Sequence, residues 1–284
     1  ELHARLHPVE GDAPGGVGQT LAVTTSLVTV ERDGDLLLIG VDRAAKRNAW
    51  NLQVIDEVGA AYDELARSDA RCGVLFGHGD HFSAGLDLAE VLPAVEKGGP
   101  AVLSGSSEHD PFGMYGPPVP KPVVMAVQGV AFTLSIELAL ACDIVVAADD
   151  VRFRQLEVGR GILPFGGATV RAPQQLGWGN AMRWILTGEE LGAAEAHRIG
   201  LVQEVVPAGQ QLQRAVEIAR LVAAQAPLGV QGTLANARIA ERAAAQAAAA
   251  AHLQELLPSV IASDDAAEGV ASFVERREAR FTGR

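Results

Sequence analysis

Apolar residues come in short runs along the first half of the chain. Two of these runs, residues 26–30 and 36–41, lie on either side of an Asp-Gly pair. This pair is a strong signal for a tight turn between two antiparallel strands, so a β-hairpin is predicted here. Three further apolar runs have the length of buried strands: residues 71–77, 123–127 and 143–148.

Segments with helical spacing separate and follow these runs. One helix is predicted directly after Asn51, whose side chain is expected to cap it. Its apolar residues recur at intervals of three or four: Leu52, Ile55, Val58 and Leu65. From residue 179 onward the periodicity is mainly helical, with helices predicted at residues 180–187, 193–199, 211–226, 243–251 and 264–277.

The periodicity divides the chain into three parts. Residues 1–20 are rich in Gly and Pro without periodicity and are expected to form a flexible tail. Residues 21–207 alternate between strand and helix patterns, which predicts an α/β core. Residues 208–284 are predicted to form a C-terminal helical region.

Composition and charge exclude several classes of function. Of the 284 residues, 48% are hydrophobic, which is enough for a sizeable core, yet no apolar run has the length of a membrane span. A net charge of −12 argues against nucleic-acid binding, which usually requires a basic surface. The chain opens without a signal-peptide pattern, so a cytoplasmic location is expected.

The two cysteines, Cys72 and Cys142, are expected to be buried free thiols.

Two segments point to a site. Residues 81–88 (HFSAGLDL) and 121–143 each read as a buried strand that breaks at small residues and turns into a helix. The first turn of a helix leaves backbone N–H groups without internal acceptors. Two such turns side by side would stabilise an oxygen that gains negative charge.

Glu137 lies in the second helix among apolar neighbours. Burial would raise its pKa toward neutrality, as suits a general acid or base, although an exposed helix face is the alternative.

These segments carry a family resemblance. F-S-A-G-L-D-L, K-P-V-V-M-A-V-Q-G and E-L-A-L-A-C-D-I-V-V-A resemble, in order and spacing, the enoyl-CoA hydratase/isomerase (crotonase) superfamily. The resemblance extends from about residue 21 to the C-terminus. It implies a crotonase-like α/β fold of repeated ββα units, an acyl-CoA thioester as substrate, and assembly as a homotrimer or hexamer. It implies no metal and no redox cofactor, coenzyme A being part of the substrate. The N–H groups of Leu86 and Leu134 would form the oxyanion hole.

The same resemblance suggests where coenzyme A lies. Residues 43–50 resemble the family's R-x-x-x-x-N-A-L loop, so Arg43, Lys46 and Arg47 are candidates to bind its phosphates. A solvated basic turn is an equally good interpretation of these three residues. The backbone of Ala84 would meet the adenine side. Asp87 borders the same motif, where capping of the following helix is favoured over catalysis.

A second glutamate makes hydration the favoured reaction. Residues 153–167 resemble the segment F-x-x-P-E-x-x-x-G-x-x-P-x-x-G-G, which places Glu157 on the second catalytic glutamate of the hydratases. In this interpretation Glu137 activates water and Glu157 donates the α-proton. Gly166 is a candidate to supply a further N–H at the water or acyl site. A surface salt bridge from Glu157 to Arg152, Arg154 or Arg160 is the alternative interpretation.

Two features leave the reaction and the substrate open. Residues 133–135 read Thr-Leu-Ser where many members have a glycine run, which puts the shape of the oxyanion hole in question. Isomerisation, thioester hydrolysis, C–C bond chemistry and non-catalytic acyl-CoA binding are therefore alternatives. Residues 97–120 are rich in Gly, Pro and Ser and are expected to form a mobile segment. By resemblance this segment shapes the acyl pocket, with four candidate lining residues: His109, Phe112, Met114 and Tyr115.

Overall fold

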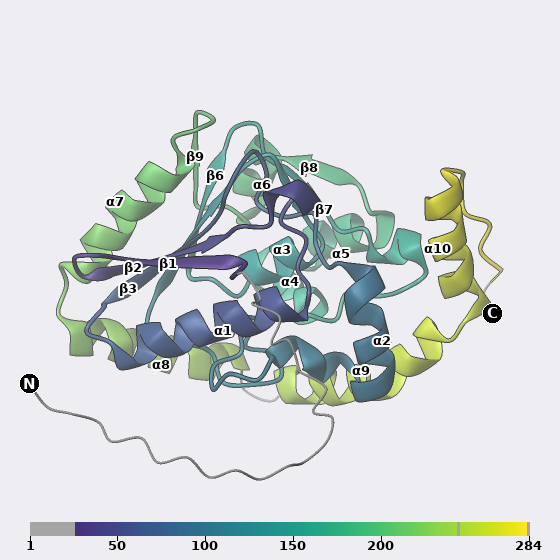
Figure 1. Ribbon diagram of the computed structural model, residues 1–284, viewed down its shortest axis with the longest axis horizontal. Coiled ribbons are helices and arrows are strands. Elements are labelled where there is room, and N and C mark those ends of the chain that lie inside the picture. Colours follow the sequence, from purple (N-terminus) through teal and green to yellow (C-terminus); the bar gives the residue numbers. More distant parts are fainter. Residues whose placement is uncertain (1–25, 243–244, 283–284) are drawn as a thin grey trace, which may run out of the picture.

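A six-stranded sheet forms the centre of the molecule (Figure 1). The computed structural model describes residues 26–242 and 245–282, so the tail predicted at residues 1–20 lies outside the described residues. The strands occur in the order β1-β2-β3-β4-β6-β9. Their bounds are Val28–Asp33 (β1), Leu36–Val41 (β2), Cys72–Gly77 (β3), Val123–Val127 (β4), Ile144–Ala148 (β6) and Glu204–Val206 (β9).

The predicted hairpin is confirmed. Strands β1 and β2 pair antiparallel, with Val28 opposite Val41, and Gly34 turns the chain with φ +59°. Glycine reaches this region without a steric penalty. All other neighbours in this sheet are parallel, which requires a crossover between successive strands.

Helices provide these crossovers. Asn51 caps the first of them as predicted, because its side chain accepts a hydrogen bond from the Val54 N–H at 3.1 Å. The helices of the core are α1 (Leu52–Arg67), α2 (Leu88–Gly98), α3 (Leu134–Ala139), α4 (Ala168–Gln175), α5 (Trp178–Thr187) and α6 (Ala193–Ile199). Short 3₁₀ turns accompany them: η1 (Ala44–Lys46), η2 (Pro100–Ser104) and η3 (Glu157–Arg160).

A small second sheet escaped the sequence analysis. It contains β5 (Val130–Phe132), β7 (Arg152–Arg154) and β8 (Glu190–Gly192) in that order. Each strand has only three residues, too few for an alternating pattern to be recognised. Strand β5 follows β4 and leads directly into α3, so this sheet fixes the start of the helix that carries Glu137.

The two faces of the main sheet have different covers. Successive residues of a strand point to opposite faces. In β4, Val124 and Ala126 join the cluster formed with Ala215 and Ala219 of α7, whereas Met125 belongs to the larger core on the other side. Helix α7 (Gln211–Ala223) therefore covers one face of the sheet, and α1 packs on the opposite side (Figure 1).

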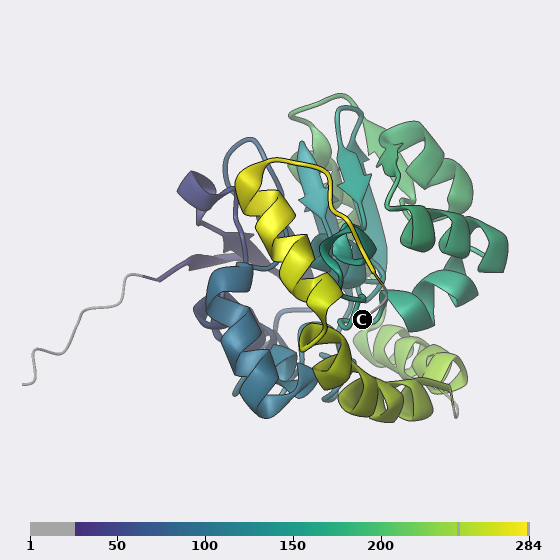
Figure 2. The same ribbon diagram turned by 90° about the vertical axis from the view of Figure 1, so that its right-hand side faces the viewer.

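The last helices lead back towards η3. They are α8 (Pro227–Arg242), α9 (Ala245–Ile261) and α10 (Asp264–Glu275), and α10 ends two residues before its predicted boundary. The guanidinium of Arg160 lies 4.1 Å from the centre of the Phe273 ring, and Gly269 packs against the Arg160 carbonyl. Figure 2 shows α10 crossing the front of the molecule in that view. Among the described residues, no helix is long and apolar enough to cross a membrane.

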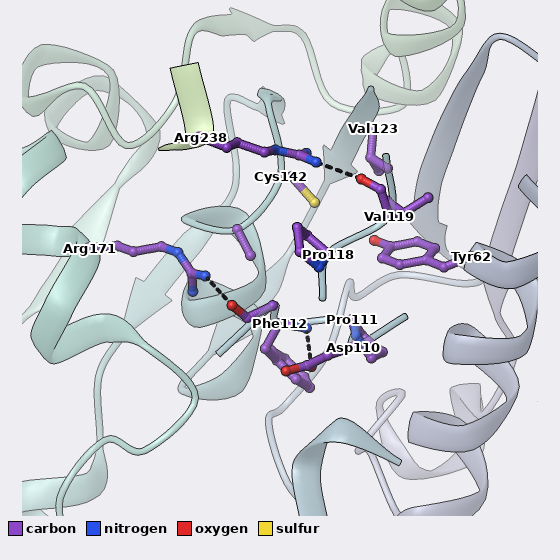
Figure 3. Close-up of a pocket in the computed structure, with 12 residues that line it drawn as sticks. Tyr62, Asp110, Pro111, Phe112, Pro118, Val119, Val123, Cys142, Arg171 and Arg238 are labelled. Atoms are coloured by element: carbon purple, nitrogen blue, oxygen red, sulfur yellow. Dashed lines mark hydrogen bonds between the residues drawn. The ribbon is translucent and has the colours of Figure 1, made fainter. Parts of the chain in front are cut away.

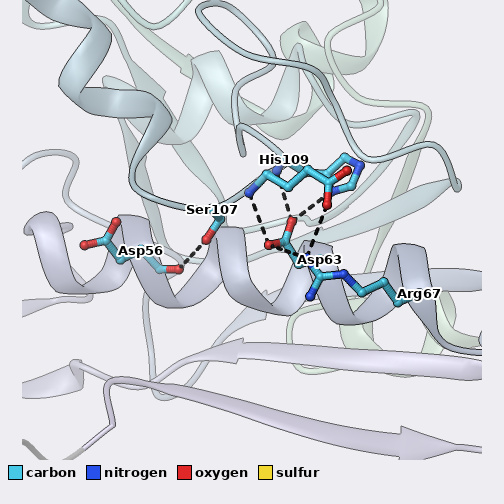
Figure 4. A network of polar contacts seen from close by, with 6 residues as sticks. Asp56, Asp63, Arg67, Ser107 and His109 are labelled. Carbon is cyan, nitrogen blue, oxygen red and sulfur yellow. Dashed lines mark hydrogen bonds and ion pairs between the residues drawn. The ribbon is translucent and has the colours of Figure 1, made fainter.

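The segment between α2 and β4 is mostly irregular, and buried aspartates anchor it. Asp63 of α1 accepts hydrogen bonds from the backbone N–H groups of Glu108 and His109, at 3.1 and 3.0 Å (Figure 4). The Nδ1 atom of His109 lies 2.8 Å from the same carboxylate. Asp63, Glu108 and His109 are close enough to suggest a cation site, but Asp63 already accepts these N–H groups. The cluster thus fastens the segment to α1.

Candidate active site

The two motif segments lie side by side. The Ser83 N–H donates to the Val130 carbonyl and the Phe132 N–H donates to the Ser83 carbonyl, both at 3.0 Å. The Ser135 hydroxyl donates to the Ser83 carbonyl as well, at 3.1 Å. These bonds join the exit of β3 to β5 and the start of α3. The sequence analysis predicted this neighbourhood from the two strand-to-helix turns.

Gly85 and Thr133 lie directly against each other, one on each segment. A Cβ atom at Gly85, which has φ +98°, would collide with the Thr133 hydroxyl. Thr133 stands at the start of the stretch where many family members have glycines, and it has φ +49° and ψ −112°. This region strongly disfavours residues with a side chain, so the surrounding hydrogen bonds must hold Thr133 in place. One is the bond from its own N–H to the Arg154 carbonyl at 2.9 Å.

Each of these two residues is followed directly by a backbone donor. The N–H groups of Leu86 and Leu134 donate to no acceptor among the described residues. Leu134 is the first residue of α3, where a helix provides no internal acceptor. Its side chain is 1% exposed and belongs to the hydrophobic core. The leucine that replaces a glycine therefore buries its side chain and keeps its N–H group.

Glu137 is buried on α3, as the sequence analysis favoured. It is 2% exposed, and its Oε1 atom accepts hydrogen bonds from the N–H groups of Gly166 and Ala168, at 2.8 and 3.1 Å. Burial raises the pKa of Glu137 to about 7, although these N–H groups and Arg171 oppose the rise. The Gly166 N–H had been a candidate donor to water or substrate, whereas in the structure it binds this carboxylate.

Glu157 lies close enough to Glu137 for the two to titrate together. Burial, and then the charge of Glu137, raise the pKa of Glu157 well above its usual value. Its Oε1 atom accepts a hydrogen bond from Gln155 at 3.0 Å, and its Oε2 atom has no partner among the described residues. Because two neighbouring carboxylates repel each other when both are charged, the pair loses its protons in two separate steps, and between these steps one carboxyl is protonated while the other is ionised. The pair can thus offer one acid and one base at the same pH.

The proposed salt bridge of Glu157 is absent from the described part of the chain. Arg152 pairs with Glu190, and Arg154 donates to the Gly188 carbonyl. Arg160 lies over the Phe273 ring. The alternative interpretation of Glu157 as a surface ion pair is therefore wrong. The reason is that η3 turns this side chain inward, where it is 7% exposed.

Arg43 and Asp87 hold each other. Arg43 Nη1 lies 2.8 Å from Asp87 Oδ2, and Arg43 Nη2 lies 2.9 Å from Glu90 Oε1. Asp87 occupies the N-cap position of α2, but its side chain accepts no capping hydrogen bond. The predicted capping role is therefore wrong, because the arginine takes the carboxylate. Phosphate binding by Arg43 stays a prediction.

The other basic residues lie beside the first motif. The Ala84 N–H donates to the Arg47 carbonyl at 2.9 Å, and Trp50 donates to the Gly85 carbonyl at 2.8 Å. The loop thus runs along residues 84–87. Lys46 and Arg47 are exposed. Their positive charge is available to an anionic ligand that follows this edge.

The candidate acyl-pocket residues separate into two groups. The Tyr115 hydroxyl donates to the Phe165 carbonyl at 2.6 Å, and Met114 packs near Gly167, so both reach the turn that holds Glu137. Phe112 is buried against Trp50, with ring centres 5.7 Å apart. His109 binds Asp63 on α1 instead.

Sequence reasoning missed three residues that support the carboxylates: Gln155, Ala168 and Arg171. Gln155 and Arg171 are 0% and 4% exposed. Their burial could not be predicted from the sequence, because other polar residues stand close to both: Arg154 and Glu157 near Gln155, and Gln174 near Arg171. The N–H of Ala168 carried no signal, because any residue except proline supplies one.

Comparison with known proteins agrees with this geometry. The chain is 35% identical to "Enoyl-CoA hydratase EchA19" of Mycobacterium tuberculosis, covering 90% of this chain and 96% of that protein. It is 33% identical to "2,3-dehydroadipyl-CoA hydratase" of Escherichia coli, covering 91% and 100%.

Solved structures give the same answer for the fold. A carnitinyl-CoA hydratase from Mycobacterium avium superposes with a TM-score of 0.80 at 32% identity, over 92% of this chain and all of that one. A probable enoyl-CoA hydratase/isomerase from Mycobacterium abscessus superposes with a TM-score of 0.73 at 45% identity, over 91% and 99%. The family model for enoyl-CoA hydratase/isomerase matches residues 31–284. The chain therefore belongs to the enoyl-CoA hydratase/isomerase family.

Proposed function

We propose that this protein adds water across the double bond of a 2-enoyl-CoA and so forms a 3-hydroxyacyl-CoA. The observation that carries this proposal is the pair of buried carboxylates, Glu137 and Glu157, that lie close together. The backbone N–H groups of Leu86 and Leu134, which have no acceptor among the described residues, support it. Hydration needs both a base and an acid at the substrate, and a pair with separated pKa values supplies them. Several relatives bear the name enoyl-CoA hydratase, in agreement with this reaction.

In this proposal Leu86 and Leu134 form the oxyanion hole. Their N–H groups donate to the thioester oxygen, which gains negative charge when the nucleophile attacks. Loss of one such donor typically raises the barrier by about 3 kcal/mol. Both donors belong to the backbone, so the leucine at position 134 can replace glycine without loss of the hydrogen bond.

The two glutamates move the protons. Ionised Glu137 accepts a proton from water while the water oxygen bonds to C3 of the substrate. The electron pair of the C2=C3 bond moves toward the thioester oxygen, giving an enolate. Protonated Glu157 then donates its proton to C2, and the thioester carbonyl is restored. After product release, the proton on Glu137 is lost to solvent and Glu157 takes up another, so the cycle closes without oxidation or reduction.

Local cations would hold the coenzyme A part. The chain carries a net charge of −12, so its overall field opposes a polyanionic ligand. Lys46 and Arg47 lie exposed beside Ala84, whose backbone is proposed to meet the adenine. Arg43 would have to loosen its bonds to Asp87 and Glu90 to reach a phosphate.

The proposed steps use acid–base groups and backbone donors alone. We therefore expect no metal or redox cofactor, and treatment with a chelator should leave the rate unchanged.

We also propose that the protein assembles as a homotrimer or hexamer and is located in the cytoplasm. Support for the assembly comes from α10, where Val270, Phe273 and Val274 are 49%, 62% and 72% exposed. Such apolar patches commonly mark subunit contacts.

Turnover of short and medium 2-enoyl-CoAs, with identification of the product, tests the reaction. A 3-hydroxyacyl-CoA product supports hydration. A shifted double bond, free coenzyme A or a product of C–C bond cleavage would assign one of the other reactions. A rise in melting temperature with coenzyme A, without turnover of any thioester, would instead make the protein a non-catalytic binder.

A further inference from the structure

One peptide group connects the segment that follows α2 with Glu137. The carbonyl of the Phe165–Gly166 peptide accepts a hydrogen bond from the Tyr115 hydroxyl at 2.6 Å. The N–H of the same peptide donates to Glu137 Oε1 at 2.8 Å. Because a peptide group is planar and rigid, the position of its oxygen determines the direction of its N–H bond. Tyr115 thus acts on the carboxylate through a single rigid unit.

We propose that Tyr115 is a positioning residue, whose hydroxyl fixes the Phe165–Gly166 peptide and thereby the orientation and proton affinity of Glu137. This inference rests on the proposed function for its catalytic consequence, but the hydrogen-bond chain itself can be tested without turnover. Through this hydrogen-bond chain, residues 110–116 are connected to Glu137, the proposed general base. Positioning Glu137 is a different role for Tyr115 from lining an acyl pocket.

The loop that carries Tyr115 is built to hold it still. The Asp110 carboxylate, 2% exposed, accepts hydrogen bonds from four backbone N–H groups of the loop, at 2.8 to 3.0 Å. These donors are Phe112, Met114, Tyr115 and Gly116. Arg171 of α4 binds the loop from the other side, with Nη2 3.1 Å from the Gly113 carbonyl (Figure 3).

The expected direction of the effect follows from hydrogen-bond polarisation. A donor at the peptide oxygen draws electron density from the N–H and makes it a stronger donor. A stronger N–H donor favours the ionised carboxylate. Removal of the phenol should therefore make Glu137 harder to ionise. Among the described residues, two further charged groups act on Glu137: a charge on Glu157 of η3 opposes its ionisation, and Arg171 of α4 favours it.

The matched variants are Tyr115→Phe and Tyr62→Phe. Each removes one phenolic oxygen from a side chain packed in the interior. Tyr62 is 3% exposed and lies beside Cys142 and Arg238 rather than against the 165–168 turn. The sequence contains only these two tyrosines, so the comparison uses every tyrosine of the chain.

The decisive measurement is the titration of the Glu137 carboxyl carbon by NMR with ¹³C-labelled glutamate. Comparison with Glu137→Gln assigns the signal, and a Glu157→Gln background removes the coupled titration. We expect Tyr115→Phe to move the Glu137 midpoint upward by roughly half a unit, and Tyr62→Phe to leave it in place. An unchanged midpoint in Tyr115→Phe, or an equal change in both variants, overturns the inference.

Kinetics of the single variants, with Glu157 intact, give an independent readout. In Tyr115→Phe we expect kcat to fall about tenfold, KM to stay within about twofold, and the acidic limb of the kcat/KM profile to move to higher pH. A loss of rate with an unmoved acidic limb would assign Tyr115 a merely structural role and contradict the inference. A wild-type protein without hydratase activity would refute the proposed function, while the titration would still decide the inference.

Discussion

The buried carboxylate of Glu137 carries a cost to stability. Its pKa is raised by burial from 4.5 to about 7, so the folded protein binds this proton more tightly than the unfolded chain does. The group therefore costs nothing well below pH 4.5, and its cost grows as the pH rises towards 7. In the proposed mechanism, the base that works near neutral pH thus lowers the free energy of unfolding.

Replacement of Glu137 by glutamine should stabilise the protein at alkaline pH. The shift in pKa corresponds to roughly 3 kcal/mol above pH 7, since each unit equals about 1.4 kcal/mol. We expect Glu137→Gln to raise the melting temperature clearly at pH 8 and little at pH 5. The exposed Glu31→Gln is the control and should change little at either pH. A melting temperature of Glu137→Gln at or below wild type at pH 8 would argue against a buried carboxylate.

Gly166 should be intolerant of any side chain. A Cβ atom there would lie 2.6 Å from Glu137 Oε2, so alanine must displace the carboxylate. Misplacement of a catalytic group by about 1 Å can cost roughly 100-fold in rate, which is the loss we expect for Gly166→Ala. Gly159→Ala, where a Cβ meets nothing within 4 Å, provides the matched control and should keep near-normal kcat/KM. Equal activity of the two variants would contradict the geometry.

At the level of residues, the sequence marked Glu137 by its apolar neighbours and by a family motif, and Glu157 by a family motif alone. It did not reveal that Arg43 and Asp87 neutralise each other. Those residues are far apart in sequence, and only the pairing of the 43–50 loop with residues 84–87 brings them together. Such contacts depend on tertiary structure and leave no local pattern.

Among the elements, the loop at residues 110–116 depends most on a single side chain. Asp110 accepts four backbone N–H bonds, and each hydrogen bond to a charged group contributes about 1.5–3 kcal/mol. We expect Asp110→Ala to lower the free energy of unfolding by at least about 2 kcal/mol and to reduce kcat, because Tyr115 is no longer held. Chemical denaturation measures the first effect. The exposed Asp150→Ala should be neutral, and equal stability of both variants would show that the loop does not need Asp110.

Turn signals and periodicity predicted some elements and missed others. The hairpin β1–β2, the capped helix α1 and the helices α5, α6 and α7 were predicted, whereas α8, with 16 residues, was not. Strands β5, β7 and β8 have three residues each, and the fold fixes them through pairing that is not encoded locally. For residues 97–120 the lack of periodicity correctly predicted an irregular path through most of the segment. Its anchoring by Asp63 and Asp110 could not be foreseen.

For the whole molecule, the exposed apolar residues of α10 predict self-association. Sedimentation should give a mass of three or six times 29.6 kDa. Phe273→Asp should shift the mass toward the monomer because it places a charge in the contact, whereas Phe273→Leu should assemble normally. A monomeric wild-type protein at micromolar concentration would contradict the proposed assembly.

The central claim is that two buried glutamates hydrate an enoyl-CoA. Its most direct test is the loss of enoyl-thioester absorbance at neutral pH, measured for wild type, Glu137→Gln and Glu157→Gln, with circular dichroism to verify folding. The account predicts turnover by wild type and a fall of roughly 100- to 10,000-fold in each folded variant, the range expected for loss of general acid–base catalysis. Near-wild-type turnover by either variant would contradict the two-carboxylate mechanism.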